Sequence, residues 1–235
     1  MSQAIDRIYL HAAERAGRLA NESHRITSNE HEVRPIIAIA GLHGAQREEV
    51  AAKVAEALDF DYLNGQVLER IAKRADVPVE RVAWLDERRI NMVTETVAAF
   101  DPEPHFQAAE YRAELGLVMR EIIAEGNAVV VGHGGRYFLG ARPGLRVYVT
   151  APLQERIEAV AQQTGLDPSK AEAQVRLVDG ERAHFLRDYL DADPEHPELS
   201  SDLVLNVGLL GVEGAVNAIL AAYAARFPTG RRTEV

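Results

Sequence analysis

Short apolar runs alternate with longer amphipathic segments along most of this chain. Residues 36–40 form a run rich in β-branched side chains that ends at Gly41, and apolar residues then recur at helical spacing from Val50 onward. Similar runs, each followed by a turn or a helical pattern, occur at residues 60–63, 128–131, 145–150 and 202–206. Because strands that alternate with helices form parallel sheets, the pattern predicts a doubly wound α/β fold with helices on both faces.

The segments between these runs have helical periodicity and predict the helices of the fold. Apart from the helix that follows the first run, we expect them at residues 66–74, 77–88, 90–100, 106–125, 152–163, 170–189 and 211–227. Residues 2–21 carry a further amphipathic stripe, followed by a polar linker. The pattern therefore predicts an N-terminal arm at 1–33, one domain at 34–227 and a polar tail at 228–235.

Composition narrows the function classes. The chain has 235 residues, of which 47% are hydrophobic, enough for a substantial core. A formal net charge of −10 argues against nucleic acid or an anionic membrane as the main partner. The chain has no cysteine, which excludes disulfides, thiolate zinc sites and cysteine nucleophiles. No apolar run has the length of a signal peptide core or a membrane span, so we expect a soluble, cytoplasmic protein.

The loop after the first run is the main candidate for chemistry. In a parallel sheet such a loop directs backbone N–H groups and a helix N-terminus toward one point, where a phosphate binds well. The Walker A phosphate loop has a second glycine, a lysine for the outer phosphates and a hydroxyl for Mg²⁺. Counted from Gly41, these three positions hold Gln46, Arg47 and Glu48. The loop is therefore predicted to be a degenerate phosphate loop.

Several phrases further along the chain support a family resemblance. They are Val130-Val-Gly-His-Gly-Gly-Arg-Tyr-Phe-Leu139, Val147-Tyr-Val-Thr-Ala-Pro-Leu-Gln-Glu-Arg-Ile157, Asp179-Gly-Glu-Arg182, Asp202-Leu-Val-Leu-Asn206 and Gly211-Val-Glu-Gly-Ala-Val216. With these phrases, residues from about 35 to 223 resemble the cytidylate-kinase-like family of P-loop nucleoside monophosphate kinases. The resemblance implies a phosphate-loop core, a monophosphate-side helical insertion at 60–106 and an arginine-bearing lid at 165–200.

The resemblance also implies roles for individual residues. Catalytic roles fall on Arg47, Arg176, Asp179 and Arg182. Contacts with the phosphates of ATP fall on Gly41, Gly44, Ala45, Gln46, Arg47, Glu48 and Glu49, and substrate contacts on Asn64, His133, Arg136, Arg156 and Arg187. If the protein is active, ATP and Mg²⁺ are its cofactors. If it is inactive, we expect none, and the residues predict no protein-bound metal site of their own.

The departures from the family pattern leave two main hypotheses. Glu48 and Glu49 suit the dipole of a helix N-terminus, but they repel a triphosphate bound there. His133 stands where the family usually has an arginine, and an unperturbed histidine is largely neutral at physiological pH. The first hypothesis is a pseudoenzyme that binds a nucleotide or a protein partner. The second is an active ATP-dependent kinase for CMP or dCMP in which Arg47 replaces the lysine and a carboxylate, Glu48 or Glu49, helps to hold Mg²⁺.

Some assignments keep a structural alternative. The lid arginines have carboxylates at or near helical spacing (Glu172, Glu181 and Asp188), so they are also explained as surface ion pairs. His133 is also explained as a hydrogen-bonded loop histidine. A different anionic ligand remains a third possibility for the arginines. The N-terminal stripe is consistent with a protein partner or a second copy of the chain, and no feature predicts a nucleic-acid or membrane partner.

Overall fold

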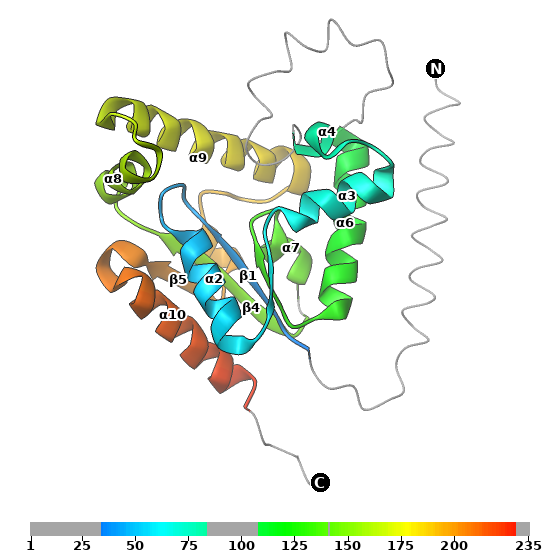
Figure 1. Ribbon diagram of the computed structural model, residues 1–235. Coiled ribbons are helices and arrows are strands. Elements are labelled where there is room, and N and C mark those ends of the chain that lie inside the picture. Colours follow the sequence, from blue (N-terminus) through cyan, green and yellow to red (C-terminus); the bar gives the residue numbers. More distant parts are fainter. Residues whose placement is uncertain (1–33, 84–107, 141, 229–235) are drawn as a thin grey trace, which may run out of the picture. The chain divides into compact units, whose positions relative to one another are not determined.

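Five parallel strands form the centre of the protein. The computed structural model describes residues 34–83, 108–140 and 142–228 (Figure 1). The strands are β1 (Ile36–Gly41), β2 (Asp61–Leu63), β3 (Ala128–Val131), β4 (Gly144–Thr150) and β5 (Leu203–Asn206). Their spatial order is β2-β3-β1-β4-β5, and every pairing is parallel. The predicted doubly wound parallel sheet is therefore confirmed.

The strand order places β1 at the point where the winding reverses. After β1 the chain moves past the position of β3 to form β2, returns to form β3, and then crosses to β4 on the other side of β1. The carboxyl ends of β1, β3 and β4 consequently flank one crevice. In open α/β sheets, ligands bind in that crevice.

Helices lie along the sheet where the sequence pattern predicts them. They are α2 (Arg47–Leu58), α3 (Gln66–Ala75), α4 (Val79–Ala83), α6 (Ala108–Glu125), α7 (Gly135–Leu139), α8 (Leu153–Thr164), α9 (Pro168–Leu190) and α10 (Val207–Arg226), with the 3₁₀ helix η1 (Pro197–Ser200). Neither α7 nor η1 is predicted by the pattern, because α7 is a single turn inside a glycine-rich phrase and η1 lies in a proline-broken segment. The predicted N-terminal arm, the helix at 90–100 and part of the helix at 77–88 lie outside the described residues.

Two apolar layers cover the two faces of the sheet. Side chains alternate along β1, so Ile36 and Ala38 pack with α3, α6 and α7, whereas Ile37 and Ile39 pack with α2 and α10. Figure 1 shows α2 and α10 together on one side of the sheet and α3, α6 and α7 on the other. All four of these β1 side chains are fully buried. The base of the crevice is thus a rigid strand fixed from both faces.

Helix α10 combines a kink with an apolar sequence. Gly211 has non-helical φ 68° and ψ 169°, so the turn at 207–210 is set off from the helix that the sequence predicts from residue 211. Among the described residues, α10 is the one helix long and apolar enough to cross a membrane, with a mean hydropathy of 1.6. Its residues Ala215, Val216 and Ile219 pack into the core, while Leu209 and Leu210 near its start are exposed.

Candidate functional site

The loop between β1 and α2 makes close backbone contacts that its glycines allow. A Cβ atom on Gly41 would lie 2.3 Å from the carbonyl oxygen of Val149. A Cβ atom on Gly44 would lie 2.5 Å from the carbonyl oxygen of Arg156, and Gly44 has φ +81°. Glycine is the residue that adopts such a conformation without steric cost. The loop is therefore pressed against β4 and α8.

Gln46 has left-handed backbone geometry at the position of the second Walker glycine. Its φ is 54° and its ψ is 27°, and its side chain makes no capping hydrogen bond to α2. A left-handed conformation is uncommon for a residue with a Cβ atom and costs roughly 1 kcal/mol. The loop thus keeps a left-handed turn before the helix although the glycine is absent.

Arg47 begins α2 and is directed into the site. It is 3% exposed, and its Nε donates to the Glu48 carboxylate over 3.0 Å. Burial by itself raises the pKa of the Glu48 carboxyl, but the charge and hydrogen bond of Arg47 outweigh this effect and hold the pKa below its ordinary value. The residues at the lysine and hydroxyl positions are therefore joined as an ion pair.

The backbone N–H and the backbone carbonyl of His43 are hydrogen-bonded to the two members of an ion pair on other elements. Its N–H donates to Asp179 Oδ1 over 2.8 Å, and its carbonyl accepts from Arg156 Nη1 over 3.1 Å. Arg156 and Asp179 are themselves joined at 2.6 Å. Arg182, one turn beyond Asp179 on α9, donates to the Gly41 carbonyl over 3.2 Å. Helices α8 and α9 thus contact the loop along its whole first half.

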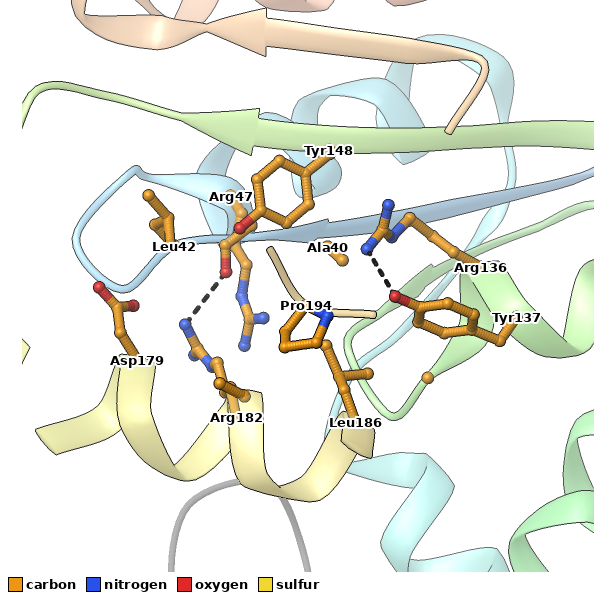
Figure 2. Close-up of a pocket in the computed structure, with 13 residues that line it drawn as sticks. Ala40, Leu42, Arg47, Arg136, Tyr137, Tyr148, Asp179, Arg182, Leu186 and Pro194 are labelled. Carbon is orange, nitrogen blue, oxygen red and sulfur yellow. Dashed lines mark hydrogen bonds between the residues drawn. The ribbon is translucent and has the colours of Figure 1, made fainter. Parts of the chain in front are cut away.

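A pocket of about 110 Å³ opens beside this loop. Its lining consists of Ala40, Gly41, Leu42, Arg47, Gly134, Arg136, Tyr137, Tyr148, Asp179, Arg182, Ala183, Leu186 and Pro194. Three arginines and one aspartate line it, which leaves two positive charges in excess. Figure 2 shows Arg47 and Arg182 near the loop and Arg136 beside Tyr137 at the other end. A water-excluding wall strengthens the attraction of such a cationic pocket for anions.

Arg136 ties the pocket to the segment between α9 and β5. Its guanidinium lies 4.8 Å from the ring centre of Tyr148 and 5.3 Å from that of Tyr137, within the range of cation–π attraction. Its Nη1 donates to the Pro197 carbonyl over 3.2 Å and to the hydroxyl of Ser201. Pro194, from the same segment, lines the pocket. Arg136 therefore holds in place one wall of the pocket, where the resemblance implies a substrate contact.

Burial perturbs two protonatable side chains around the loop. The pKa of His43 falls to about 4, first because of burial and then because of the positive charge of Arg182, so its imidazole is neutral at physiological pH. In the described part of the chain no group hydrogen-bonds its buried Nε2. Burial also raises the pKa of the Tyr148 phenol. The net positive charge of the site therefore comes from arginines.

Asn64 and His133 are brought together, but away from the pocket lining. They follow β2 and β3, and His133 Nε2 lies 2.9 Å from the Asn64 carbonyl oxygen. The hydrogen-bonded loop histidine that the sequence leaves open is therefore present. His133 is buried and has φ 50°.

Two predicted lid arginines are exposed and do not line the pocket. Arg176 is paired with Glu172 at 2.8 Å across one helical turn, with 63% of its side chain exposed. Arg187 is also exposed. Glu49, predicted to contact phosphate, is exposed on α2, whereas Ala45 is buried beneath the loop.

Several lining residues are not predicted from the sequence. Tyr148 lies between Val147 and Val149, whose side chains enter the core on the opposite face of β4. The alternation along the strand at its carboxyl end is a signal that could have identified it. Leu42, Tyr137 and Pro194 have no comparable signal. In the described residues, no group of three or more histidine, aspartate or glutamate side chains is arranged to hold a metal ion.

Comparisons with known proteins agree with this architecture. Residues 36–208 match the model of the cytidylate kinase-like family. The chain is 25% identical over 185 residues to a cytidylate kinase of Staphylothermus marinus, covering 78% of this chain and 93% of that protein.

Two solved structures share the fold. An uncharacterized protein from Eubacterium ventriosum superposes with a TM-score of 0.63 at 17% identity, covering 82% of this chain and 100% of that one. A shikimate kinase from Acinetobacter baumannii, solved with shikimate, gives a TM-score of 0.50 at 17% identity, covering 84% of this chain and 97% of that one. At these identities the two structures establish the fold alone.

Proposed function

Because the chain belongs to the cytidylate kinase-like family, we propose that it binds a nucleotide through its phosphates at the β1–α2 loop, with phosphoryl transfer reduced or lost. The observation that supports binding is the cluster of Arg47, Arg136 and Arg182 around the pocket beside that loop. Guanidinium groups bind phosphate oxygens through paired, charge-assisted hydrogen bonds. A phosphate group is therefore the ligand best matched to the pocket.

Reduced transfer is supported by the Arg47–Glu48 ion pair. Phosphoryl transfer depends on positioning and on cations that neutralise charge developing on the transferred group. Here the guanidinium at the lysine position is already 3.0 Å from a carboxylate at the hydroxyl position. That carboxylate also repels a triphosphate at the same helix N-terminus. Both changes weaken the stabilisation on which catalysis depends.

In the part of the chain that the structure describes, no group of three or more carboxylate or histidine side chains is preformed to hold Mg²⁺. Mg²⁺ prefers oxygen ligands in octahedral geometry and usually enters with the phosphates of its substrate. The carboxylates nearest the pocket are Glu48 and Asp179, each paired with an arginine. If ATP binds with Mg²⁺, the phosphates would supply most of the oxygen ligands, and Glu48 would have to leave Arg47 to contribute.

The size of the pocket indicates that ligand binding involves movement. Pockets for small molecules usually enclose about 300–1,000 Å³, whereas this one encloses about 110 Å³. A phosphoryl group fits such a volume, but a whole nucleotide does not. We propose that the walls formed by α9 and by Pro194 shift when a whole nucleotide is enclosed, as a lid at 165–200 would.

An active ATP-dependent kinase for CMP or dCMP is the second candidate. It is favoured by the burial of Arg47 and Arg182, 3% and 8% exposed, at the pocket wall, where they are placed to contact a transferred phosphate. In that case Arg47 takes the role of the lysine. The contact between His133 and Asn64 counts against it, because a monophosphate bound there would meet a histidine that is already hydrogen-bonded in place of an arginine.

Turnover and binding measured side by side separate the two candidates. We expect calorimetric titration with ATP to show binding, and coupled-enzyme assays with CMP, dCMP and UMP plus Mg-ATP to show little or no turnover. Arg47→Ala should weaken binding by about tenfold or more, the usual cost of losing a charge-assisted contact. Lys53→Ala, an exposed cation on the same helix paired with Glu213, is the matched control. Robust turnover that Arg47→Ala abolishes would establish the kinase, and no heat with ATP would reject both candidates.

The remaining assignments stay proposals. We propose that residues 1–33 are an arm separate from the domain at 34–227, and that this arm contacts a protein partner or a second copy of the chain. A cytoplasmic location is proposed because no apolar run in the sequence has the length of a signal peptide core or a membrane span. Size-exclusion chromatography with light scattering of the full chain and of a chain beginning at residue 34 tests the arm, because a shared oligomeric state would exclude self-association through it.

A further inference from the structure

One ion pair holds the backbone of a single residue of the phosphate loop, His43, through the two peptide groups on either side of its Cα atom. Asp179 Oδ1 accepts the N–H of His43 over 2.8 Å, while Arg156 Nη1 donates to the carbonyl of His43 over 3.1 Å. The two side chains meet at 2.6 Å, and Arg156 Nε also donates to the Ala151 carbonyl over 3.1 Å. Loop, helix α8, helix α9 and the end of β4 are joined at this point. The orientation of the His43 backbone is therefore fixed by groups far from it in sequence.

The pair is shielded enough for its geometry to matter. The Arg156 side chain is 8% exposed and that of Asp179 is 21% exposed. Breaking a buried pair by removing one partner leaves an uncompensated charge, which makes such pairs specific for one arrangement. Gly44 adds to this specificity, because a Cβ atom there would collide with the Arg156 backbone.

We infer that Arg156 and Asp179 are positioning residues that set the shape of the loop. Arg156 is absent from the pocket lining and contacts two carbonyls and Asp179. Asp179 reaches the pocket wall, but its two carboxylate oxygens are engaged by the His43 N–H and by Arg156. Because the N–H and the carbonyl of His43 are both held, the loop backbone that leads to Gln46 and to the first turn of α2 keeps its orientation toward the pocket. Arg182 secures the start of the loop through the Gly41 carbonyl.

The inference differs from the role that the family resemblance implies. There Arg156 contacts substrate and Asp179 has a catalytic role. Here the two side chains act through the backbone N–H and carbonyl of His43, and they control the shape of the loop. The inference rests on the proposed function only for what the loop binds, because the shape of the loop can be measured without any ligand.

Amide hydrogen exchange of the unliganded full-length protein tests the inference directly. We expect Arg156→Gln and Asp179→Ala to speed exchange of the His43 amide and its loop neighbours by about tenfold or more, the size expected for losing one charge-assisted hydrogen bond. Exchange in β1 and β3 should stay unchanged. Asp179→Asn, which keeps an oxygen acceptor for the His43 N–H, should recover part of the protection.

The control is a second ion pair on the same sheet. Arg146 of β4 pairs with Asp202 at 2.8 Å, and its side-chain hydrogen bonds in the described residues go to Asp202 and not to the loop. Arg146→Gln should leave loop exchange as in the natural chain. Unchanged loop protection in Arg156→Gln and Asp179→Ala, or an equal change in Arg146→Gln, would overturn the inference.

Titration of the same variants with ATP gives a second readout. A positioning role predicts that ATP affinity is lowest in Asp179→Ala, intermediate in Asp179→Asn and highest in the natural chain. A purely global loss of stability would instead lower the melting temperature of the variants. It would leave their ATP affinities equal when affinity is measured well below that temperature. If the natural chain binds no ATP, the proposed function fails, while the exchange experiment still decides the inference.

Discussion

The two ends of the crevice differ in the basic side chains that they contain. At the carboxyl end of β1, Arg47 and Arg182 are buried against the phosphate loop. At the carboxyl ends of β2 and β3, the His133 ring is hydrogen-bonded to the backbone carbonyl oxygen of Asn64. The loop end thus holds two buried arginines, whereas at the other end a hydrogen-bonded histidine stands where the family resemblance implies an arginine.

The arginines of α3 strengthen this contrast. Arg70 pairs with Glu125 at 2.8 Å, and Arg74 pairs with both Glu114 and Glu121 on α6. These cations brace the helical layer and are compensated by carboxylates. By contrast, Arg47, Arg136 and Arg182 line the pocket together with one carboxylate, that of Asp179.

Exchanging one residue at each end gives the largest expected effect. Arg182→Met should weaken ATP binding by about tenfold to a hundredfold, because a charge-assisted contact is worth about 1.5–3 kcal/mol. His133→Asn should change it by less than about twofold, since asparagine tolerates the left-handed backbone at that position. Calorimetric titration measures both, with circular dichroism to confirm the fold. Equal losses in the two variants would show that both ends contact the ligand.

Regular alternation made the fold predictable from the sequence. The apolar runs at 36–40 and 128–131 are buried on both faces, and such strands occur in parallel sheets covered by helices. Helix α9 was predicted to within two residues at its start and one at its end. The short α7 was missed, because a five-residue helix after several glycines has no periodic signal.

The site was less predictable because its contacts join distant residues. Arg182 and Asp179 lie three residues apart on one helix face, so a shared role could be predicted from spacing. The bond from Asp179 to the His43 peptide spans 136 residues, and only the packing of α9 over the loop creates it. For the same reason the sequence could not show that Arg136 holds the segment after α9.

Acid sensitivity offers a smaller test of the loop end. The pKa of His43 is lowered from 6.5 to about 4, so between these values the unfolded chain binds more protons than the folded one. The free energy of unfolding should therefore rise with pH across this window and level off above it. Allowing for partial exposure, we expect about 1–3 kcal/mol from this group.

His43→Gln isolates that contribution from the titration of carboxylates. Urea unfolding at about pH 7 and about pH 4.5 should show a smaller loss of stability on acidification in this variant than in the natural chain. An equal loss in both would mean that His43 is protonated as readily as in the unfolded chain, and that the loop end is less shielded than its contacts indicate.

The smallest expected effect concerns Arg176, to which the family resemblance gives a catalytic role. Six residues separate it from Arg182, about 1.7 turns, so the two side chains leave α9 about 120° apart. Arg182 lines the pocket, and Arg176 accordingly faces outward and pairs with Glu172. An exposed pair of this spacing contributes at most about 0.5 kcal/mol. Arg176→Ala should thus leave both melting temperature and ATP affinity nearly unchanged, as thermal unfolding and calorimetry will measure. A loss of affinity close to that of Arg182→Met would require α9 to rotate when ligand binds, and the contrast between the two ends of the crevice would then describe only the ligand-free protein.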